Sequence, residues 1–295
     1  MFFKSNDNRP VETGDPSLFS MERIGRRIMH ARKKKGMTQM ELADRMGISF
    51  QAVSNWERGQ SCPDIAKLFE LSVLFDVSID ELLGSPRAAQ IASEVMDGTT
   101  PALPVEELAE VAPLLDQKQA DEVIQKSLSQ EPPAEQAREE ASPSPEPHKC
   151  RIDRVEDILP LLPYASEETV SIFAKTLLRR TQSVEQILPL LDYMDADDVG
   201  EAAIDFVDAT RSLEPIRPLL DYMDADDVGK AALTYANGTR DAKQILPLLD
   251  YMDADDVGKV AKVILDGTRD PKQITPFLDY MDEDDVNALL RSLLS

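Results

Sequence analysis

Residues 187–200 read ILPLLDYMDADDVG, and nearly the same stretch returns at residues 216–229 and at residues 245–258. A weaker copy, ITPFLDYMDEDDVN, begins at Ile274, so successive copies start 29 residues apart. A fixed period of this length is typical of a solenoid, in which each short unit buries its apolar face only against its neighbours. The repeat therefore predicts a stack of helical units.

Two more distant copies extend the array toward the N-terminus. ILPLLPYASEETV occupies residues 158–170, and VAPLLDQKQADEV occupies residues 111–123, 47 positions earlier. The extra 18 positions match a segment rich in Pro, Glu and Ser, which predicts a disordered or semi-extended linker over residues 130–150. The sequence thus predicts one degenerate helical repeat over residues 105–129 and five helical-hairpin repeats over residues 151–295.

One repeat has room for two helices, of about 11 and about 14 residues, joined by a tight corner. Asp195 is expected to cap the second helix, with Met194 packed on Val199 as a hydrophobic staple. Pro189 falls in the first helix, so we expect a kink or a helix that begins later. Room for close helix approach is expected at Gly200, Gly229 and Gly258. The array resembles HEAT-type helical repeats in architecture.

Tyrosine recurs at one position of five successive repeats, namely Tyr164, Tyr193, Tyr222, Tyr251 and Tyr280. Two interpretations fit this pattern. The rings pack against the next repeat, or they line a groove that binds a peptide.

Residues 21–84 have a different pattern, in which apolar residues at helical spacing form short segments. These segments are broken at Gly36, Gly47, Gly59 and Gly84. Residues suited to the N-cap precede four of them: Thr38, Ser49, Asp64 and Ser78. The pattern predicts five helices, preceded by a flexible lead-in over residues 1–20 and followed by a connector over residues 85–104.

Residues 24–84 resemble the XRE-type helix-turn-helix domain of phage repressors and Cro proteins. The resemblance rests on Thr38-Gln39, Glu41-Leu42-Ala43, Gly47 in the turn, Val53-Ser54-Asn55-Trp56-Glu57 with Gly59, and the closing Asp76-Val77-Ser78-Ile79-Asp80-Glu81-Leu82-Leu83. Few unrelated sequences satisfy all of these motifs. We therefore expect an all-α chain, with a five-helix repressor-type domain followed by an α-solenoid of two-helix repeats with a 29-residue period.

The resemblance implies that a helix over about residues 49–58 enters the major groove, while a helix over about residues 38–46 braces on the DNA backbone. It turns four side chains toward the base edges: Phe50, Gln51, Ser54 and Asn55. Amide side chains pair with adenine, and a phenyl ring contacts the thymine methyl group. The alternatives are a solvated helix face for the amides and packing inside the domain for Phe50. Residues 63–65 (PDI) replace a basic minor-groove contact, so minor-groove recognition is not expected.

Contacts with DNA phosphates are expected from Thr38, Gln39, Lys34, Lys35 and Arg58. Ordinary surface charge is the alternative for the three basic residues. The resemblance instead makes Arg32 and Glu57 a structural ion pair between the first and third helices, and it places Trp56 in the core. Similar domains bind two half-sites as dimers. The expected partners are double-stranded DNA, a second copy of the chain, and a protein that binds the repeats.

The charge is unevenly distributed along the chain. The formal net charge is −23, but residues 1–87 carry +1 and the remaining residues carry −24. Residues 21–35 alone carry +6, and such a focus of positive charge attracts phosphate. This distribution suggests an autoinhibition hypothesis, in which the acidic segment docks on the basic face and competes with DNA.

Several other classes of protein and site are not expected. No run approaches the roughly 18 apolar residues of a membrane span, and MFFKSNDNRP lacks the features of a signal peptide, so we expect a cytoplasmic protein. Cys62 and Cys150 give no disulfide framework. The acidic run after Asp195 fails as a calcium loop because Val199 stands where an oxygen is required, and His148 with Cys150 lacks a second ligand pair for zinc. We expect no metal, no cofactor and no enzyme activity.

The resemblance to XRE-type domains implies a sequence-specific transcriptional regulator that acts as a repressor, and the acidic repeats are expected to serve dimerisation, partner binding or sensing. The alternative is a protein-interaction scaffold in which the acidic solenoid is the main functional surface. The two hypotheses differ in one property, because the scaffold predicts DNA binding that is weak or serves only to localise the protein.

Overall fold

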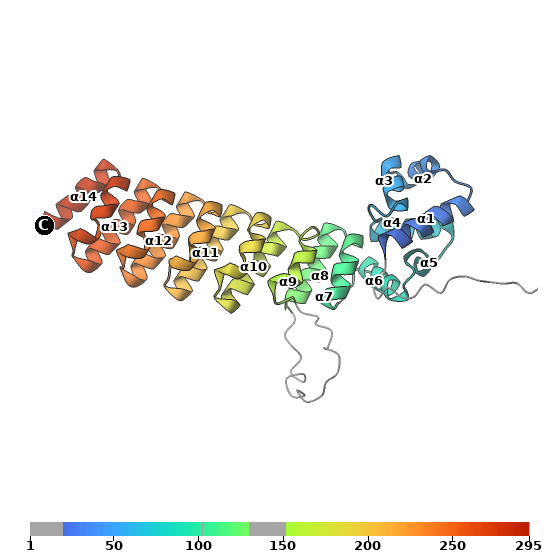
Figure 1. Ribbon diagram of the computed structural model, residues 1–295, viewed down its shortest axis with the longest axis horizontal. Coiled ribbons are helices and arrows are strands. Elements are labelled where there is room, and N and C mark those ends of the chain that lie inside the picture. Colours follow the sequence, from blue (N-terminus) through green and yellow to red (C-terminus); the bar gives the residue numbers. More distant parts are fainter. Residues whose placement is uncertain (1–19, 102, 130–151, 295) are drawn as a thin grey trace, which may run out of the picture. The chain divides into compact units, whose positions relative to one another are not determined.

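The structure is a computed structural model that describes residues 20–101, 103–129 and 152–294. Every regular element in these ranges is helical, as predicted (Figure 1). Contacts divide the chain into two compact units, with the boundary after Lys126. The predicted lead-in, up to residue 19, and the predicted linker lie outside the described residues. None of the described helices has the length and apolar character needed to cross a membrane.

The first five helices confirm the predicted five-helix domain. They are α1 (Met21–Lys34), α2 (Gln39–Met46), α3 (Phe50–Glu57), α4 (Ile65–Phe75) and α5 (Ile79–Leu83). The side chain of each predicted N-cap residue accepts a hydrogen bond from a backbone N–H in the first turn of its helix, at Thr38, Ser49, Asp64 and Ser78. Local capping chemistry therefore sets where four of the five helices begin.

The core of this domain forms where α1 packs on α3, α4 and α5, and where α2 packs on α3. Ile28, Leu42, Val53 and Leu68 are completely buried there. Burying each such side chain contributes about 1.5–3 kcal/mol relative to leaving it exposed. Between α2 and α3 the chain reverses at Gly47, whose φ of 63° lies in the left-handed region that favours glycine.

Three further helices follow, α6 (Pro86–Met96), α7 (Val105–Val111) and α8 (Gln117–Ser129), with the 3-10 helix η1 (Ala112–Leu114) between α7 and α8. Residues 85–104, predicted as a connector, thus include a helix that packs on α4 and α5 and buries Ile91 and Ala92. Residues 105–129, predicted as a degenerate repeat, contain a helix, a turn that carries Pro113, and a second helix.

The second unit is a stack of helical repeats, as the 29-residue period predicted. Its α-helices are α9 (Val155–Ile158), α10 (Glu167–Thr181), α11 (Ala196–Thr210), α12 (Ala225–Thr239), α13 (Ala254–Thr268) and α14 (Glu283–Leu294). From α10 to α14 they stand side by side in chain order, each packed against the next (Figure 1).

An α-helix of about 11 residues was expected in the first half of each repeat, but this half is 3-10 helix, preceded in the first repeat by the four-residue α9. These segments are η3 (Leu159–Leu161), η4 (Val184–Gln186), η5 (Leu188–Tyr193), η6 (Glu214–Tyr222), η7 (Ala242–Gln244), η8 (Leu246–Tyr251), η9 (Pro271–Gln273) and η10 (Thr275–Tyr280). Pro189 lacks an N–H and stands in the first turn of η5, where the tighter ladder tolerates it. The Leu190 N–H donates to the Ile187 carbonyl over 2.9 Å, three residues back. Each α-helix from α10 to α14 is therefore preceded by one or two 3-10 segments.

Glycines allow neighbouring repeats to approach closely, but the approaching group differs from the expected one. A Cβ atom on Gly200 would overlap the carboxylate of Asp227 in the next repeat. The same relation joins Gly229 to Asp256 and Gly258 to Asp285. The small residue thus makes room for an aspartate side chain rather than for a helix backbone.

The ends of the repeat helices show one confirmed and one unexpected feature. Asp195 caps α11 by accepting a hydrogen bond from the Asp198 N–H over 2.8 Å, as predicted. Asp224 and Asp253 occupy the same N-cap position without that side-chain bond. At the other end, a residue other than glycine adopts a left-handed conformation, with φ between 50° and 56°, at Gln182, Arg211, Arg240 and Arg269.

Candidate nucleic-acid interface

Helix α3 has one buried side and one accessible side. Val53, Trp56 and Glu57 are buried against the rest of the domain. The four residues predicted to contact bases lie on the other side: Phe50 and Gln51 are exposed, while Ser54 and Asn55 are half-buried. The side chain of Phe50 is 44% exposed, so it does not pack inside the domain.

Hydrogen bonds join the polar residues of this accessible side. The Gln51 amide donates to Asn55 Oδ1 over 2.9 Å, and Arg58 Nη2 donates to the same oxygen over 2.8 Å. Arg58 Nε also donates to the backbone carbonyl of Ser54. The two amides and the guanidinium therefore form one connected polar surface, whose donors and acceptors match those that adenine and phosphate need.

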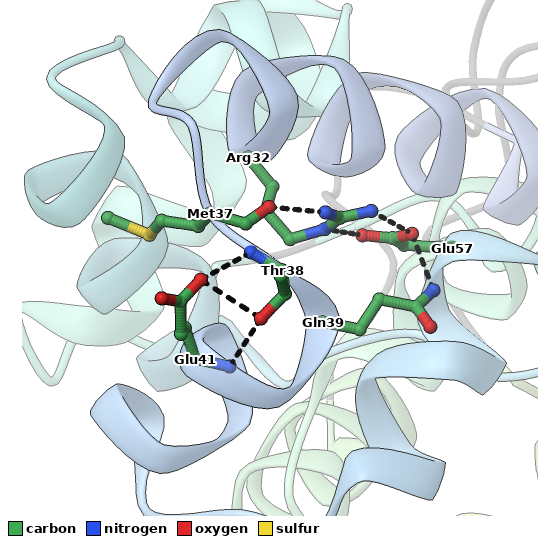
Figure 2. Close-up of polar contacts among 6 residues, drawn as sticks. All are labelled: Arg32, Met37, Thr38, Gln39, Glu41 and Glu57. Carbon is green, nitrogen blue, oxygen red and sulfur yellow. Dashed lines mark hydrogen bonds and ion pairs between the residues drawn. The ribbon is translucent and has the colours of Figure 1, made fainter.

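A buried ion pair anchors the opposite side of α3. Arg32 of α1 donates to both carboxylate oxygens of Glu57, over 2.5 and 2.9 Å (Figure 2). The two side chains are only 8% and 3% exposed. Hydrogen bonding to Glu57 raises the pKa of Arg32, so this guanidinium remains charged. This is the contact that the resemblance to XRE-type domains implied.

The same carboxylate also holds the start of α2. Gln39 Nε2 donates to Glu57 Oε2 over 2.7 Å, and Arg32 Nη1 donates to the Met37 carbonyl over 2.6 Å (Figure 2). Arg32 and Glu57 thus connect α1, the turn after it, α2 and α3. Gln39 is expected to contact a DNA phosphate, and its bond to Glu57 could not be read from the sequence.

A reciprocal capping box surrounds Gln39. The Thr38 N–H donates to Glu41 Oε2 over 2.7 Å, and the Glu41 N–H donates to Thr38 Oγ1 over 3.1 Å (Figure 2). Hydrogen bonds from the backbone and hydroxyl of Thr38 lower the pKa of Glu41. The capping box therefore fixes where α2 begins, and the dipole of this helix favours an anion such as a DNA phosphate at its N-terminus.

The basic residues of α1 are divided between two sides of that helix. Arg32 faces α3, as does Gly25, where a Cβ atom would collide with the Trp56 carbonyl oxygen. At 100° per residue, Lys34 lies on the opposite side. It lines a cleft of about 440 Å³ together with Arg23, Arg26, Arg27, His30, Ala31, Val77, Glu81 and Leu82. The +6 stretch therefore does not form one continuous surface beside α3.

Two residues outside α3, Cys62 and His30, have side chains that could take part in nucleophilic or metal chemistry. Cys62 is half-buried, and burial raises the pKa of its thiol to about 12. His30 lines the cleft beside α1. Within the described ranges no three His, Cys, Asp or Glu side chains gather closely enough to hold a metal ion.

Comparison of the sequence with known proteins identifies a family for the helix-turn-helix domain. The family described as Helix-turn-helix matches residues 28–82. The transcriptional regulator ImmR of Bacillus subtilis is 40% identical over 23% of this chain and 53% of its own length. The CTXphi transcriptional repressor RstR of Vibrio cholerae is 34% identical over 21% of this chain and 55% of its own length.

A third relative is matched over most of its length. The uncharacterized transcriptional regulator y4dJ of Sinorhizobium fredii is 38% identical over 20% of this chain and 78% of its own length. This chain therefore spans about half of ImmR and RstR, and the similarity lies in the helix-turn-helix domain. No solved structure matches the chain. By its motifs, its five-helix geometry and these relatives, the chain belongs to the XRE-type helix-turn-helix family of transcriptional regulators.

Proposed function

We propose that this chain is a sequence-specific DNA-binding repressor whose helix α3 lies in the major groove. One observation carries the proposal. Phe50, Gln51, Ser54 and Asn55 share the accessible side of α3, while a buried ion pair fixes the other side to α1. A helix held in this way presents its side chains to base edges without rearranging the domain.

Each side chain on this surface has a distinct proposed role. Gln51 and Asn55 offer the paired donor and acceptor that adenine N7 and N6 require, and Ser54 offers a hydroxyl that bonds to several bases. Phe50 contributes an exposed ring for a thymine methyl group. One well-made bidentate contact discriminates against the wrong base by about 1–3 kcal/mol.

Phosphate contacts complete the proposed interface on both sides of α3. Thr38 and Gln39 lie at the positive end of α2, and Arg58 extends from the end of α3. Lys35, the C-cap of α1, is proposed to contact the same backbone. Because Lys34 lies in the cleft on the far side of α1, we propose that it acts through the electrostatic field that attracts DNA.

We propose that two copies bind two half-sites about one turn of DNA apart, as helix-turn-helix dimers do. A bound dimer that overlaps a promoter excludes RNA polymerase, and this is the proposed direction of regulation. The helical repeats are proposed to supply dimerisation, partner binding or sensing. In the scaffold alternative, the acidic repeats are the main working surface and DNA binding lacks sequence preference.

Selection of bound fragments from genomic DNA tests the proposal. The full chain is compared with the double variant Gln51→Ala/Asn55→Ala, and Glu70→Ala, an exposed change on α4, is the control. The proposal expects a shared motif with wild type and control, and its loss with the double variant. Fragments without any shared motif would refute the repressor and favour the scaffold. Reporter transcription from a selected fragment that rises with the protein would refute repression.

A further inference from the structure

The 3-10 segments of the repeats carry a row of exposed aromatic and acidic side chains. Tyr193, Tyr222, Tyr251 and Tyr280 are 42%, 41%, 39% and 40% exposed. An exposed aspartate precedes each ring, at Asp192, Asp221, Asp250 and Asp279. We call these eight residues the Tyr–Asp row. Tyr164, in the first of the five predicted ladder positions, is half-buried and lacks a preceding aspartate.

The row is continuous from repeat to repeat. Segments η5, η6, η8 and η10 contact one another in order. Asp250 raises the pKa of Tyr280 through a hydrogen bond and through its charge, and Asp221 raises the pKa of Tyr251 chiefly through its charge. Each of these aspartates belongs to the repeat before its tyrosine. The rings and carboxylates therefore alternate along the stack instead of forming separate clusters.

Positions of the repeat differ in how much they vary from one copy to the next. The buried position filled by Phe206 in α11 holds Tyr235 in α12 and Ile264 in α13. The exposed Asp–Tyr pair, by contrast, is identical in four repeats. Buried residues of the same repeated block are equally constant, such as Leu191, Leu220 and Leu249, and the Asp–Tyr pair itself makes contacts between repeats. The exposure and charge of the row, and not its constancy, therefore indicate a partner.

The chemistry of the row specifies the partner. The face of a tyrosine ring attracts Arg or Lys, and a neighbouring carboxylate adds charge attraction. The same carboxylates repel nucleic acid. Adjacent packed helices lie about 8–10 Å apart, and a polyproline II chain advances about 9 Å over the three residues of one turn. If every third residue of such a chain is basic, successive basic side chains therefore lie opposite successive repeats.

We propose that the Tyr–Asp row binds an extended, basic, polyproline II-like segment of another protein, with Arg or Lys at every third position. The inference rests on the proposed role of the repeats in partner binding. It is independent of DNA recognition, because the residues of the row belong to the second unit.

The test measures binding of the fluorescein-labelled peptide (Arg-Pro-Pro)5 to the full chain by fluorescence anisotropy. A peptide of equal composition with its five arginines adjacent is the spacing control. The proposal expects saturable binding of the spaced peptide, with the clustered peptide at least about fivefold weaker. No binding of the spaced peptide, or equal affinity for both peptides, would overturn it.

Two sets of variants connect binding to the row. Tyr222→Ala/Tyr251→Ala is expected to weaken binding about tenfold, whereas Tyr222→Phe/Tyr251→Phe, which retains the rings, stays within about twofold of wild type. Equal loss in both double variants would assign the effect to the phenol hydroxyls and overturn a cation–ring contact. Circular dichroism on each variant verifies the fold.

Matched charge changes provide the second set. Asp192→Asn/Asp250→Asn removes two carboxylates of the row, and Asp208→Asn/Asp266→Asn removes two exposed carboxylates from α11 and α13 at the same spacing of two repeats. The first pair is expected to weaken peptide binding at least fivefold more than the second. Equal effects would reduce the interaction to general charge attraction. Operator binding that persists while peptide binding is absent would refute this inference and leave the proposed repressor intact.

Discussion

Removing Glu57 is expected to cost the helix-turn-helix domain a substantial share of its stability. In Glu57→Met the buried guanidinium of Arg32, with its side chain 8% exposed, retains the Met37 carbonyl but loses its carboxylate partner. Breaking a buried pair by removing one partner costs about 3–5 kcal/mol. A domain has about 5–15 kcal/mol of stability in total, so the variant should lose a substantial share of it. Gln39 also loses the acceptor that holds it at the start of α2.

Trp56 gives a reporter for this measurement, because it is the only tryptophan of the chain and is 7% exposed on α3. Urea unfolding of the full chain, followed by tryptophan fluorescence, therefore reports on the helix-turn-helix domain. The double variant Arg32→Met/Glu57→Met removes both charges and should recover most of the loss. Glu41→Met, at the exposed capping box, should cost about 0.5–2 kcal/mol.

Two results would refute this reasoning. One is a loss below about 1 kcal/mol for Glu57→Met, which would mean that Arg32 finds water or another partner at little cost. The other is a double variant whose loss of unfolding free energy equals the sum of the losses in Arg32→Met and Glu57→Met, because that would show that the two charges do not interact.

Three further predictions concern other parts of the chain. Gly229→Ala should destabilise the repeats by about 1–3 kcal/mol in thermal unfolding, because its methyl group overlaps Asp256, and Asp256→Ala should restore much of the loss; an unchanged melting temperature would contradict the close approach. In a Cys150→Ser variant at pH 8, Cys62 should react with Ellman's reagent at least about a hundredfold more slowly in the folded than in the urea-unfolded chain, because a pKa of about 12 leaves the thiol protonated. Comparable rates would show that the thiol is accessible. Truncation after Ser129 removes residues with a net charge of −18 and should tighten DNA binding at low salt if the acidic repeats compete for the basic face; unchanged affinity would count against autoinhibition.

Features set by local chemistry could be predicted from the sequence. Thr38 and Ser49 begin α2 and α3 because their side chains satisfy backbone donors within the same turn. The accessible side of α3, with Gln51 and Asn55 on it and Val53 buried, is the one that the resemblance to XRE-type domains implied. The 29-residue period predicted the stack of repeats because each unit depends only on its neighbours.

Features set by distant neighbours could not be predicted in this way. Arg211 adopts a left-handed conformation at the end of α11, and its side chain packs beside Gly238 of the next repeat. Pro189 lies in the first turn of a 3-10 helix, where a kinked or later-starting α-helix was expected. The two sides of α1 differ because α3 and α5 pack against it at different places. Lys34 consequently lies in the cleft, away from the residues that contact α3. Such outcomes depend on packing across elements.

The most direct test of base recognition by α3 compares the affinity for a selected DNA site with that for a scrambled site over a range of salt concentrations. Wild-type protein should prefer the selected site by at least about a thousandfold. Asn55→Ala should lose about 10- to 100-fold of that preference with its salt dependence unchanged, whereas Lys35→Ala should weaken binding to both sites and lower the salt slope. An Asn55→Ala variant that weakens binding equally to both sites would contradict the proposal that α3 recognises bases.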